Sequence, residues 1–269
     1  MNKINILAPY QTSFTIRTDC DELLKFLVLE HGQYATSVNC STDYTITVSK
    51  NREIYKISFE NQTIKTDIPL RIIKDIMYQE RKYDENIFAM HGGAVEYKNG
   101  AYLIVAATTS GKTTLTSYLV SNSFGYITDD CILLDRESFK IYPFTTPLHL
   151  RKGGYNALKA LGCAPENYVF LDSVSIKRYV YTPNNSVSKP LPLKKIFFIT
   201  RTEDTNILEE MNTTEKITAL LKSPITEYEI DGSYLSFISK LSAIPCKRLY
   251  YSNMDFVAEV IKYEQQSYN

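Results

Sequence analysis

The chain of 269 residues has no tryptophan, only three histidines and no excess of charge of either sign. Its 30 Lys and Arg balance 30 Asp and Glu, so nothing electrostatic favours nucleic acid or an anionic membrane as a partner. No stretch approaches the roughly 18 consecutive apolar residues of a membrane-spanning helix. The N-terminal residues also lack the sustained apolar run of a signal peptide, and we therefore expect a cytoplasmic protein.

Cysteine chemistry is also limited in this sequence. The five cysteines are odd in number, far apart and without a Cys-x-x-Cys pair. This spacing is typical of reduced thiols in a cytosolic protein, and it argues against a disulfide framework or a zinc site. The residues concerned are Cys20, Cys40, Cys131, Cys163 and Cys246.

A polar, charged stretch over residues 79–86 indicates a domain boundary. We predict a small N-terminal α+β domain, residues 1–85, and a second domain, residues 86–269. Hydrophobic residues make up 44% of the chain, which is enough to give each domain a core. The elements expected before the boundary are helices over 21–29 and from Pro69 onward, and strands over 44–48, 54–59 and 63–65.

After the boundary, apolar runs and helical patterns alternate in a way that predicts an α/β fold. A strand at 101–106 leads directly into a helix at 112–121. A further strand is expected over 126–134, and a buried strand over 195–200. The remaining expected strands are 91–97, 139–144, 168–171, 175–181 and 248–251, and the remaining helices are 156–161, 214–221, 234–241 and 255–263.

The segment from Ala106 to Thr113, Ala-Ala-Thr-Thr-Ser-Gly-Lys-Thr, joins that strand to that helix. This order predicts a phosphate-binding loop, because the free N–H groups at a helix N-terminus attract phosphate oxygens. Lys112 would add a positive charge at the β and γ phosphates, and the Thr113 hydroxyl would bind Mg²⁺. The predicted nucleotide-binding residues are Thr108, Thr109, Ser110, Gly111, Lys112, Thr113 and Thr114.

The loop departs from the consensus, which has Gly where this chain has Ala106. Ala is tolerated there only if its backbone stays out of the left-handed region. The alternative interpretation is an ordinary surface helix that is capped by Ser110 or Thr109.

Two adjacent acids, Asp129 and Asp130, lie within the apolar run 126–134, and His91 precedes the loop. Neighbouring carboxylates on a strand point to opposite faces, so at least one should face inward or toward a cleft. A buried lone carboxylate is costly unless a cation meets it, and Mg²⁺ on a triphosphate would be such a cation. The alternatives are turn residues at a strand end for the two acids, and a hydrogen-bonded core position for His91.

The other two histidines have weaker functional patterns. His31 followed by Gly32 has the composition of a helix C-terminus, which favours a structural role. His149 lies in an alternating stretch and fits substrate contact and solvent exposure equally well.

Together these features resemble the catalytic domain of the bacterial HPr kinase/phosphorylase and its shorter relatives, which phosphorylate peptides in natural-product pathways. The resemblance rests on His91-Gly92, on Ser110-Gly111-Lys112-Thr113 and on Asp129-Asp130. It extends more weakly to residues 147–151, 190–199 and 246–251, and it covers residues 86–265.

The resemblance implies an α/β fold with a P-loop catalytic domain of HPr kinase/phosphorylase type, and ATP and Mg²⁺ as cofactors. It implies that Asp130 accepts the hydroxyl proton, that His91 is the active-site histidine and that Lys112 is the loop lysine. Thr113 would be the Mg²⁺-binding hydroxyl residue. Asp129 would either bind the metal or orient its neighbour.

Two departures from the family are clear. Its Glu-x-Arg-Gly-Leu-Gly signature is absent, and the nearest counterpart, residues 149–154, lacks the metal-binding Glu. The loop also has Ala106 and Thr109 where the family usually has Gly. Both departures favour a divergent kinase relative over the complete bifunctional enzyme.

The sequence therefore predicts an ATP-dependent kinase whose acceptor is a hydroxyl, with Ser of a peptide or protein expected first and a small-molecule hydroxyl as the alternative. A non-catalytic NTP-binding regulator is the second hypothesis, favoured by the missing loop glycines. Residues 1–85 would either hold a substrate peptide by strand addition to a sheet edge or only cover the catalytic domain. Neither nucleic acid nor membrane is an expected partner, and homo-oligomerisation is left open.

Overall fold

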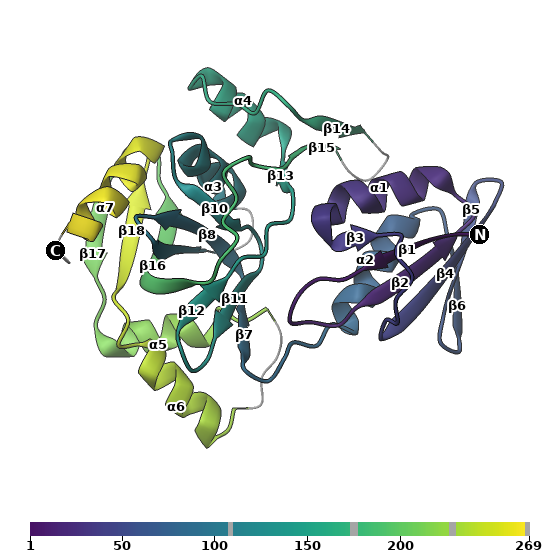
Figure 1. Cartoon of the computed structure of the whole chain (residues 1–269). Helices are drawn as coiled ribbons and strands as arrows, with labels where there is room; N and C mark the ends of the chain where they lie inside the picture. Colours follow the sequence, from purple (N-terminus) through teal and green to yellow (C-terminus); the bar gives the residue numbers. More distant parts are fainter. Residues whose placement is uncertain (107–109, 173–176, 226–229, 267–269) are drawn as a thin grey trace.

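The computed structural model describes residues 1–106, 110–172, 177–225 and 230–266, and in these ranges three β-sheets and seven α-helices form (Figure 1). This mixed architecture confirms the α/β class expected from the sequence. No helix in the described part of the chain is both long and apolar enough to cross a membrane.

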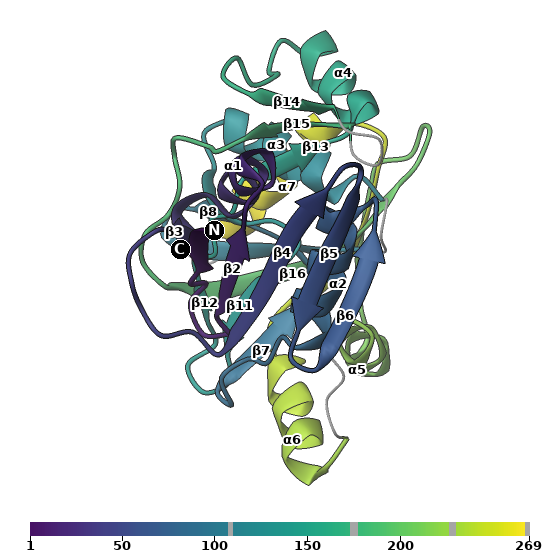
Figure 2. The ribbon, with the colours of Figure 1, turned by 90° about the vertical axis from the view of Figure 1, so that its right-hand side faces the viewer.

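The first sheet is built from residues 2–66 alone and has the strand order β3-β1-β2-β4-β5-β6. Alternate residues of a strand point to the same face of the sheet. Side chains at such positions, including Ile16, Ile46 and Ile57, are fully buried against α1 and α2. Figure 2 shows β2, β4, β5 and β6 side by side in this order. The elements are β1 (Asn2–Ile6), β2 (Phe14–Thr18), α1 (Asp21–His31), β3 (Ala35–Thr36), β4 (Tyr44–Asn51), β5 (Ile54–Phe59), β6 (Gln62–Thr66) and α2 (Pro69–Gln79), with a 3₁₀ turn at Gly32–Tyr34.

The second sheet begins at residue 87 and has the order β10-β8-β9-β16-β12-β11-β7, with β18 beside β16 and β17 beside β18. Strands β9, β16 and β18 are parallel to one another. The boundary near residue 85 remains a prediction. The strands are β7 (Ile87–Met90), β8 (Gly92–Tyr97), β9 (Gly100–Val105), β10 (Gly125–Thr128), β11 (Ile132–Asp135), β12 (Lys140–Tyr142), β16 (Leu191–Arg201), β17 (Ile207–Glu210) and β18 (Cys246–Tyr251).

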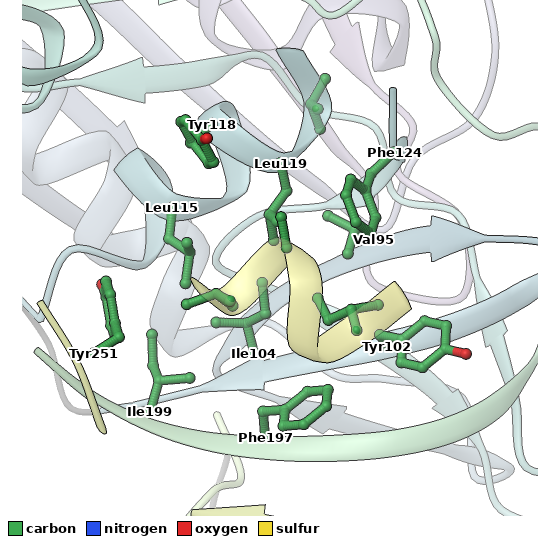
Figure 3. Packing of buried hydrophobic residues seen from close by; sticks show 14 of the residues in the cluster. Val95, Tyr102, Ile104, Leu115, Tyr118, Leu119, Phe124, Phe197, Ile199 and Tyr251 are labelled. Carbon is green, nitrogen blue, oxygen red and sulfur yellow. The ribbon is translucent and has the colours of Figure 1, made fainter. Parts of the chain in front are cut away.

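Helices cover both faces of this sheet, so β9 is buried on both sides. On one face Tyr102 and Ile104 pack under Leu115 and Leu119 of α3, as Figure 3 shows. On the other face Leu103 and its alternate neighbours pack against α5 and α6. A strand that is buried on both faces reads as a continuous apolar run, which is why this strand was predictable from sequence. The helices are α3 (Lys112–Ser121), α5 (Thr213–Leu221), α6 (Gly232–Leu241) and α7 (Met254–Gln266).

A third, three-stranded sheet with the order β13-β15-β14 lies beside α4, at the top of Figure 1. Helix α4 begins four residues earlier than the pattern at 156–161 predicts, despite two glycines in its first turn. The elements are β13 (Leu148–Leu150), α4 (Lys152–Ala160), β14 (Val169–Asp172) and β15 (Lys177–Tyr181).

The strand predicted over 126–134 is wrong in its middle, because it is two strands. The chain turns between β10 and β11: Asp130 has φ of 64°, and Cys131 N–H donates to the Asp129 carbonyl at 2.8 Å. The antiparallel partner is interrupted at the same level, where His91 separates β7 from β8. Met90 pairs with Ile132 on one side of these breaks, and residue 94 pairs with residue 128 on the other side. The break at His91 therefore lies opposite the turn at Asp129 and Asp130. A pairing between distant segments therefore brings His91 next to the two acids.

The end of α1 packs against the segment that leads into β13. Gln33 donates a side-chain hydrogen bond to the Thr145 hydroxyl, and the Tyr34 hydroxyl accepts one from Thr145 N–H at 3.1 Å. Gly32 lies against Pro147. The N-terminal sheet and the later part of the chain are thus joined by specific contacts at this point.

Two histidines, His31 and His149, are largely buried at this contact. Helix α1 ends at His31 with Gly32 as its C-cap, which confirms the structural interpretation of His31. Burial lowers the pKa of His31 to about 3 and the pKa of His149 to about 4. Nearby positive charges lower both pKa values further: Arg81, Lys74 and His149 act on His31, and Lys74 and Arg178 act on His149.

These two pKa values predict a loss of stability in mild acid. The unfolded chain protonates its histidines near pH 6.5, whereas the folded chain keeps His31 and His149 neutral to about pH 4. The unfolded state therefore binds more protons in this window, and the unfolding free energy falls as pH falls through it, by a few kcal/mol per histidine. Denaturant unfolding at several pH values should show a flatter profile for the H31Q/H149Q double variant. An equal slope in both proteins would contradict the assignment.

Candidate functional site

The turn from β9 into α3 carries most of the residues that the sequence singled out. Strand β9 ends at Val105, and α3 begins at Lys112 with Gly111 as its N-cap. Gly111 has φ of 90° and ψ of 14°, a left-handed conformation that glycine adopts without strain. Ala106 is not among the described residues with positive φ, which meets the condition for Ala at the start of the loop.

The capping alternative for Ser110 is wrong. The N-cap of α3 is Gly111, and no side chain caps it. The Ser110 hydroxyl is buried and has no hydrogen-bond partner among the described residues. A buried hydroxyl without a partner is costly, which is expected where a ligand atom completes the contact. Thr108 and Thr109 lie outside the described residues.

Lys112 is buried at the start of α3, with only 5% of its surface exposed. Its ammonium donates to the Ala106 carbonyl at 3.0 Å, so the side chain reaches back across the loop. Burial lowers the pKa of Lys112, and the nearby carboxylates of Asp130 and Asp129 oppose that shift. A desolvated positive charge at a helix N-terminus is an environment that favours an anion.

Asp129 is the buried member of the acidic pair and is 6% exposed. Its Oδ2 accepts a hydrogen bond from the Thr113 hydroxyl at 2.7 Å, and its Oδ1 has no partner among the described residues. Burial raises its pKa to about 7, the charge of Asp130 adds to this, and Thr113 and Lys112 oppose it. This carboxylate is thus held in the protein with one oxygen unsatisfied.

Gly93 explains how Asp129 comes so close to α3. A Cβ at Gly93 would lie 2.5 Å from the Thr116 hydroxyl and 3.4 Å from Asp129 Oδ1. Any side chain there would push β8 away from α3. The glycine after His91-Gly92 therefore serves the packing that brings the carboxylate to the loop.

Asp130, in contrast, is exposed, and its backbone is held by His91. The His91 Nδ1 lies 3.1 Å from the Asp130 carbonyl oxygen, and because a carbonyl only accepts, Nδ1 must carry the proton. The His91 backbone N–H donates to the Ser223 carbonyl at 2.8 Å. Its Nε2 is buried and has no partner in the described part of the chain. His91 thus fixes the turn that presents Asp130.

The site brings together Lys112, Thr113, Asp129, Asp130 and His91. The Thr114 hydroxyl instead points at Gly154 of α4, so this side chain packs between helices. Sequence reasoning missed Ser223 and Tyr251, whose hydroxyl lies 3.6 Å from the Cβ position of Gly111. Both reach the site from distant strands or loops, and neither carries a local sequence signal.

The residues present fit a hard divalent cation. The Thr113 hydroxyl and the unsatisfied carboxylate oxygen of Asp129 are the oxygen ligands that Mg²⁺ prefers. Within residues 1–106, 110–172, 177–225 and 230–266, no three His, Cys, Asp or Glu side chains cluster as a complete protein-made metal site. A cation held by Thr113 and Asp129 would take its remaining ligands from phosphates and water, as Mg²⁺ does in phosphoryl-transfer sites.

Comparison with known proteins adds little to this geometry. No protein-family model matches the chain, and no curated protein matches it. Among solved structures, the chain is similar to the Hpr(Ser) kinase/phosphatase from Coxiella burnetii, at 10% identity and a TM-score of 0.33, over 67% of this chain and 95% of that chain. This is a distant and partial match, too weak to transfer a function, and the functional proposal rests on the residues of this chain.

Proposed function

We propose that the chain is an ATP-dependent kinase that transfers the γ-phosphoryl group to a hydroxyl, with Ser of a peptide or protein as acceptor. One observation carries the proposal. At the β9–α3 turn, the buried lysine and a threonine hydroxyl of α3 meet a buried and an exposed aspartate of the β10–β11 turn. These are the three functions that phosphoryl transfer needs: phosphate binding, charge neutralisation and proton acceptance.

The nucleotide phosphates would bind at the N-terminus of α3. The first-turn backbone N–H groups and the helix dipole attract phosphate oxygens, and Lys112 adds a full positive charge. The ammonium would exchange its contact with the Ala106 carbonyl for a phosphate oxygen. The buried Ser110 hydroxyl supports a ligand at this position.

Thr113 and Asp129 would hold Mg²⁺. When bound, the ion supplies neutralisation of the negative charge on the phosphates. The role of Asp129 is then to keep a carboxylate at the loop, with Thr113 orienting one of its oxygens. This assigns Asp129 to the metal and leaves Asp130 for the acceptor.

Asp130 would accept the proton of the acceptor hydroxyl. The hydroxyl oxygen forms the new bond to the γ-phosphorus, the bond from that phosphorus to the bridging oxygen of ADP breaks, and the proton passes to the carboxylate. His91 contributes through the backbone, since it donates to the Asp130 carbonyl and thereby holds the exposed side chain in place.

A second candidate is a nucleotide-binding regulator without catalysis. The observation that favours it is the first position of the loop, where Ala106 replaces Gly and its carbonyl is held by Lys112. A loop with fewer glycines approaches phosphate less closely. Within the kinase hypothesis, a small-molecule hydroxyl is the alternative acceptor.

We expect the H91A variant to slow phosphoryl transfer more than it weakens ATP binding, with only a modest loss of stability. The reason is that His91 holds the Asp130 turn through its hydrogen bond to the Asp130 carbonyl. The H91N variant is the matched control, because its amide can still donate to the same carbonyl, and it should keep part of the activity. Transfer rate, ATP affinity and thermal unfolding are measured together. A stability loss of several kcal/mol with unchanged turnover per folded molecule would assign His91 to the core instead.

The proposed function is tested by incubating the protein with γ-labelled ATP and Mg²⁺ against two sets of acceptors. One set is a pool of Ser-containing peptides, and the other is a pool of small hydroxyl compounds. Label on the peptides supports the proposal, and label on the small compounds alone changes the acceptor class. ATP binding without label on either set would favour the regulator.

A further inference from the structure

The three-stranded sheet beside the candidate phosphate loop carries two arginines at facing positions. Leu150 of β13 pairs with Tyr179 of β15 at the end of this ladder. The next residues of the two segments are Arg151, the N-cap of α4 with an extended backbone, and Arg178, and the charge of Arg151 acts on Arg178. Leu171 of β14 is the partner of Arg178 on its other side. Directly opposed residues share a face of a sheet, which places both arginines and this leucine in one row.

The face that carries this row is turned away from α4. On the opposite face, Tyr179 stacks on Tyr155 of α4 with ring centroids 3.9 Å apart. The ring of Phe170 in β14 also contacts the Tyr179 ring. On the face of the arginines, Arg151 is exposed, Arg178 and Leu171 are half-buried, and Val169 is 49% exposed. The next pair on the same face, His149 with Val180, is largely buried. The accessible part of this face is therefore the row itself, which combines two positive charges with an apolar edge.

The two arginines make an unfavourable arrangement by themselves. Like charges at opposed strand positions repel, and burial together with the charge of Arg151 lowers the pKa of Arg178. Lys152 adds a further positive charge at the N-terminus of α4, where no acid lies in the first turn. Neither arginine forms an ion pair with any described residue, and Arg178 contacts only the Lys177 carbonyl through its guanidinium.

This row also lies close to the candidate phosphate loop. Gly154, in the first turn of α4, sits directly against the hydroxyl of Thr114 in α3. Arg151 is the N-cap of α4, and Lys112 is the first residue of α3. The end of α4 that carries Arg151 therefore lies beside the start of α3.

We infer that this face binds an acidic segment of the acceptor peptide, with a carboxylate between Arg151 and Arg178 and an apolar side chain against Val169 and Leu171. The inference deepens the proposed kinase function and rests on it for the identity of the peptide as acceptor. Charge complementarity selects the occupant, because a carboxylate relieves the repulsion of two guanidinium groups and accepts hydrogen bonds from both. The apolar edge selects a peptide over a free anion.

The test is direct binding of fluorescent serine-centred peptide pools to the full chain without ATP, followed by anisotropy. Three pools share Val and Tyr and differ in their third residue type, which is Glu, Gln or Lys. The Glu pool is expected to bind roughly tenfold or more tightly than the Gln pool. The charge-reversed R151E/R178E variant should lose this preference and gain affinity for the Lys pool. The K159E variant is the matched control, since it reverses an exposed charge at the far end of α4.

Equal affinity for the Glu and Gln pools would overturn the inference, and so would an equal effect of K159E. ATP affinity is measured in the same variants. If R151E/R178E weakens ATP binding as much as peptide binding, the arginines serve the nucleotide and the inference fails. Binding of the Glu pool that is never followed by phosphate transfer would count against the kinase alone and would support the acidic docking face.

Discussion

Replacement of Asp130 by Asn is expected to lower phosphoryl-transfer turnover by roughly 10²–10⁴-fold while ATP·Mg²⁺ binding survives. The amide cannot take the hydroxyl proton, and Lys112, Thr113 and Asp129 are untouched. Asn also tolerates the left-handed backbone at φ of 64°, so the turn that His91 holds should persist. Because Asp129 allows a partial rescue, the lower figure is expected. Single-turnover transfer and equilibrium ATP binding are measured on the same preparation.

The control for this variant is E137Q, which removes an exposed acid a few residues along the same chain segment. It should leave turnover unchanged. Transfer at the wild-type rate in D130N would exclude Asp130 as the base. Loss of ATP binding in D130N would instead show that its carboxylate holds the metal, and the roles of the two acids would have to be exchanged.

Replacement of Lys112 by Ala is expected to weaken ATP binding by about 1.5–3 kcal/mol, which is the typical contribution of one hydrogen bond from a charged donor, here the bond to the phosphates. The fold should persist, because Lys112 lies at the start of α3, where its ammonium bonds to the loop carbonyl of Ala106. Calorimetric titration of ATP into the folded variant measures the change. The K240A variant of α6, which removes an exposed lysine, is the control.

Unchanged ATP affinity in K112A would contradict the phosphate-loop assignment. The β9–α3 turn would then be an ordinary strand-to-helix connection, and the buried Ser110 hydroxyl would need another explanation. A loss in both K112A and K240A would indicate an effect of net charge on the binding of an anion and would not identify the site.

The β9–α3 turn was predictable from sequence because its signals are local. An apolar strand, the glycine and lysine at positions 111 and 112 and the apolar residues at helical spacing in α3 all lie within one short stretch. The helices over 214–221, 234–241 and 255–263 were found for the same reason, and the structure confirms them with small shifts at their ends. Asn5 shows the limit of such patterns: its strand β1 was missed, and its buried amide donates to the distant Val38 carbonyl and accepts a hydrogen bond from the Thr15 hydroxyl of β2.

The part of the site that could not be predicted depends on pairing between distant segments. A run of apolar residues with two acids in it favours one continuous strand, and the only local sign of the turn at Asp130 is the turn preference of the two acids, which was the alternative interpretation. The turn is specified by its antiparallel partner, which is interrupted at His91, and by the hydrogen bond between them. The proximity of Arg151, which follows β13, to Arg178 of β15 depends in the same way on the register of two strands far apart in sequence.

The central claim is that this chain moves the γ-phosphoryl group of ATP to a hydroxyl. The most direct measurement is the intact mass of a serine-centred acidic peptide after incubation with the wild-type chain, ATP and Mg²⁺, beside the same peptide with Ala in place of Ser. We expect a gain of one phosphate on the Ser peptide, no gain on the Ala peptide and a much slower gain with D130N. No gain on any hydroxyl acceptor while ATP binds through Lys112 would contradict it and leave a nucleotide-binding regulator.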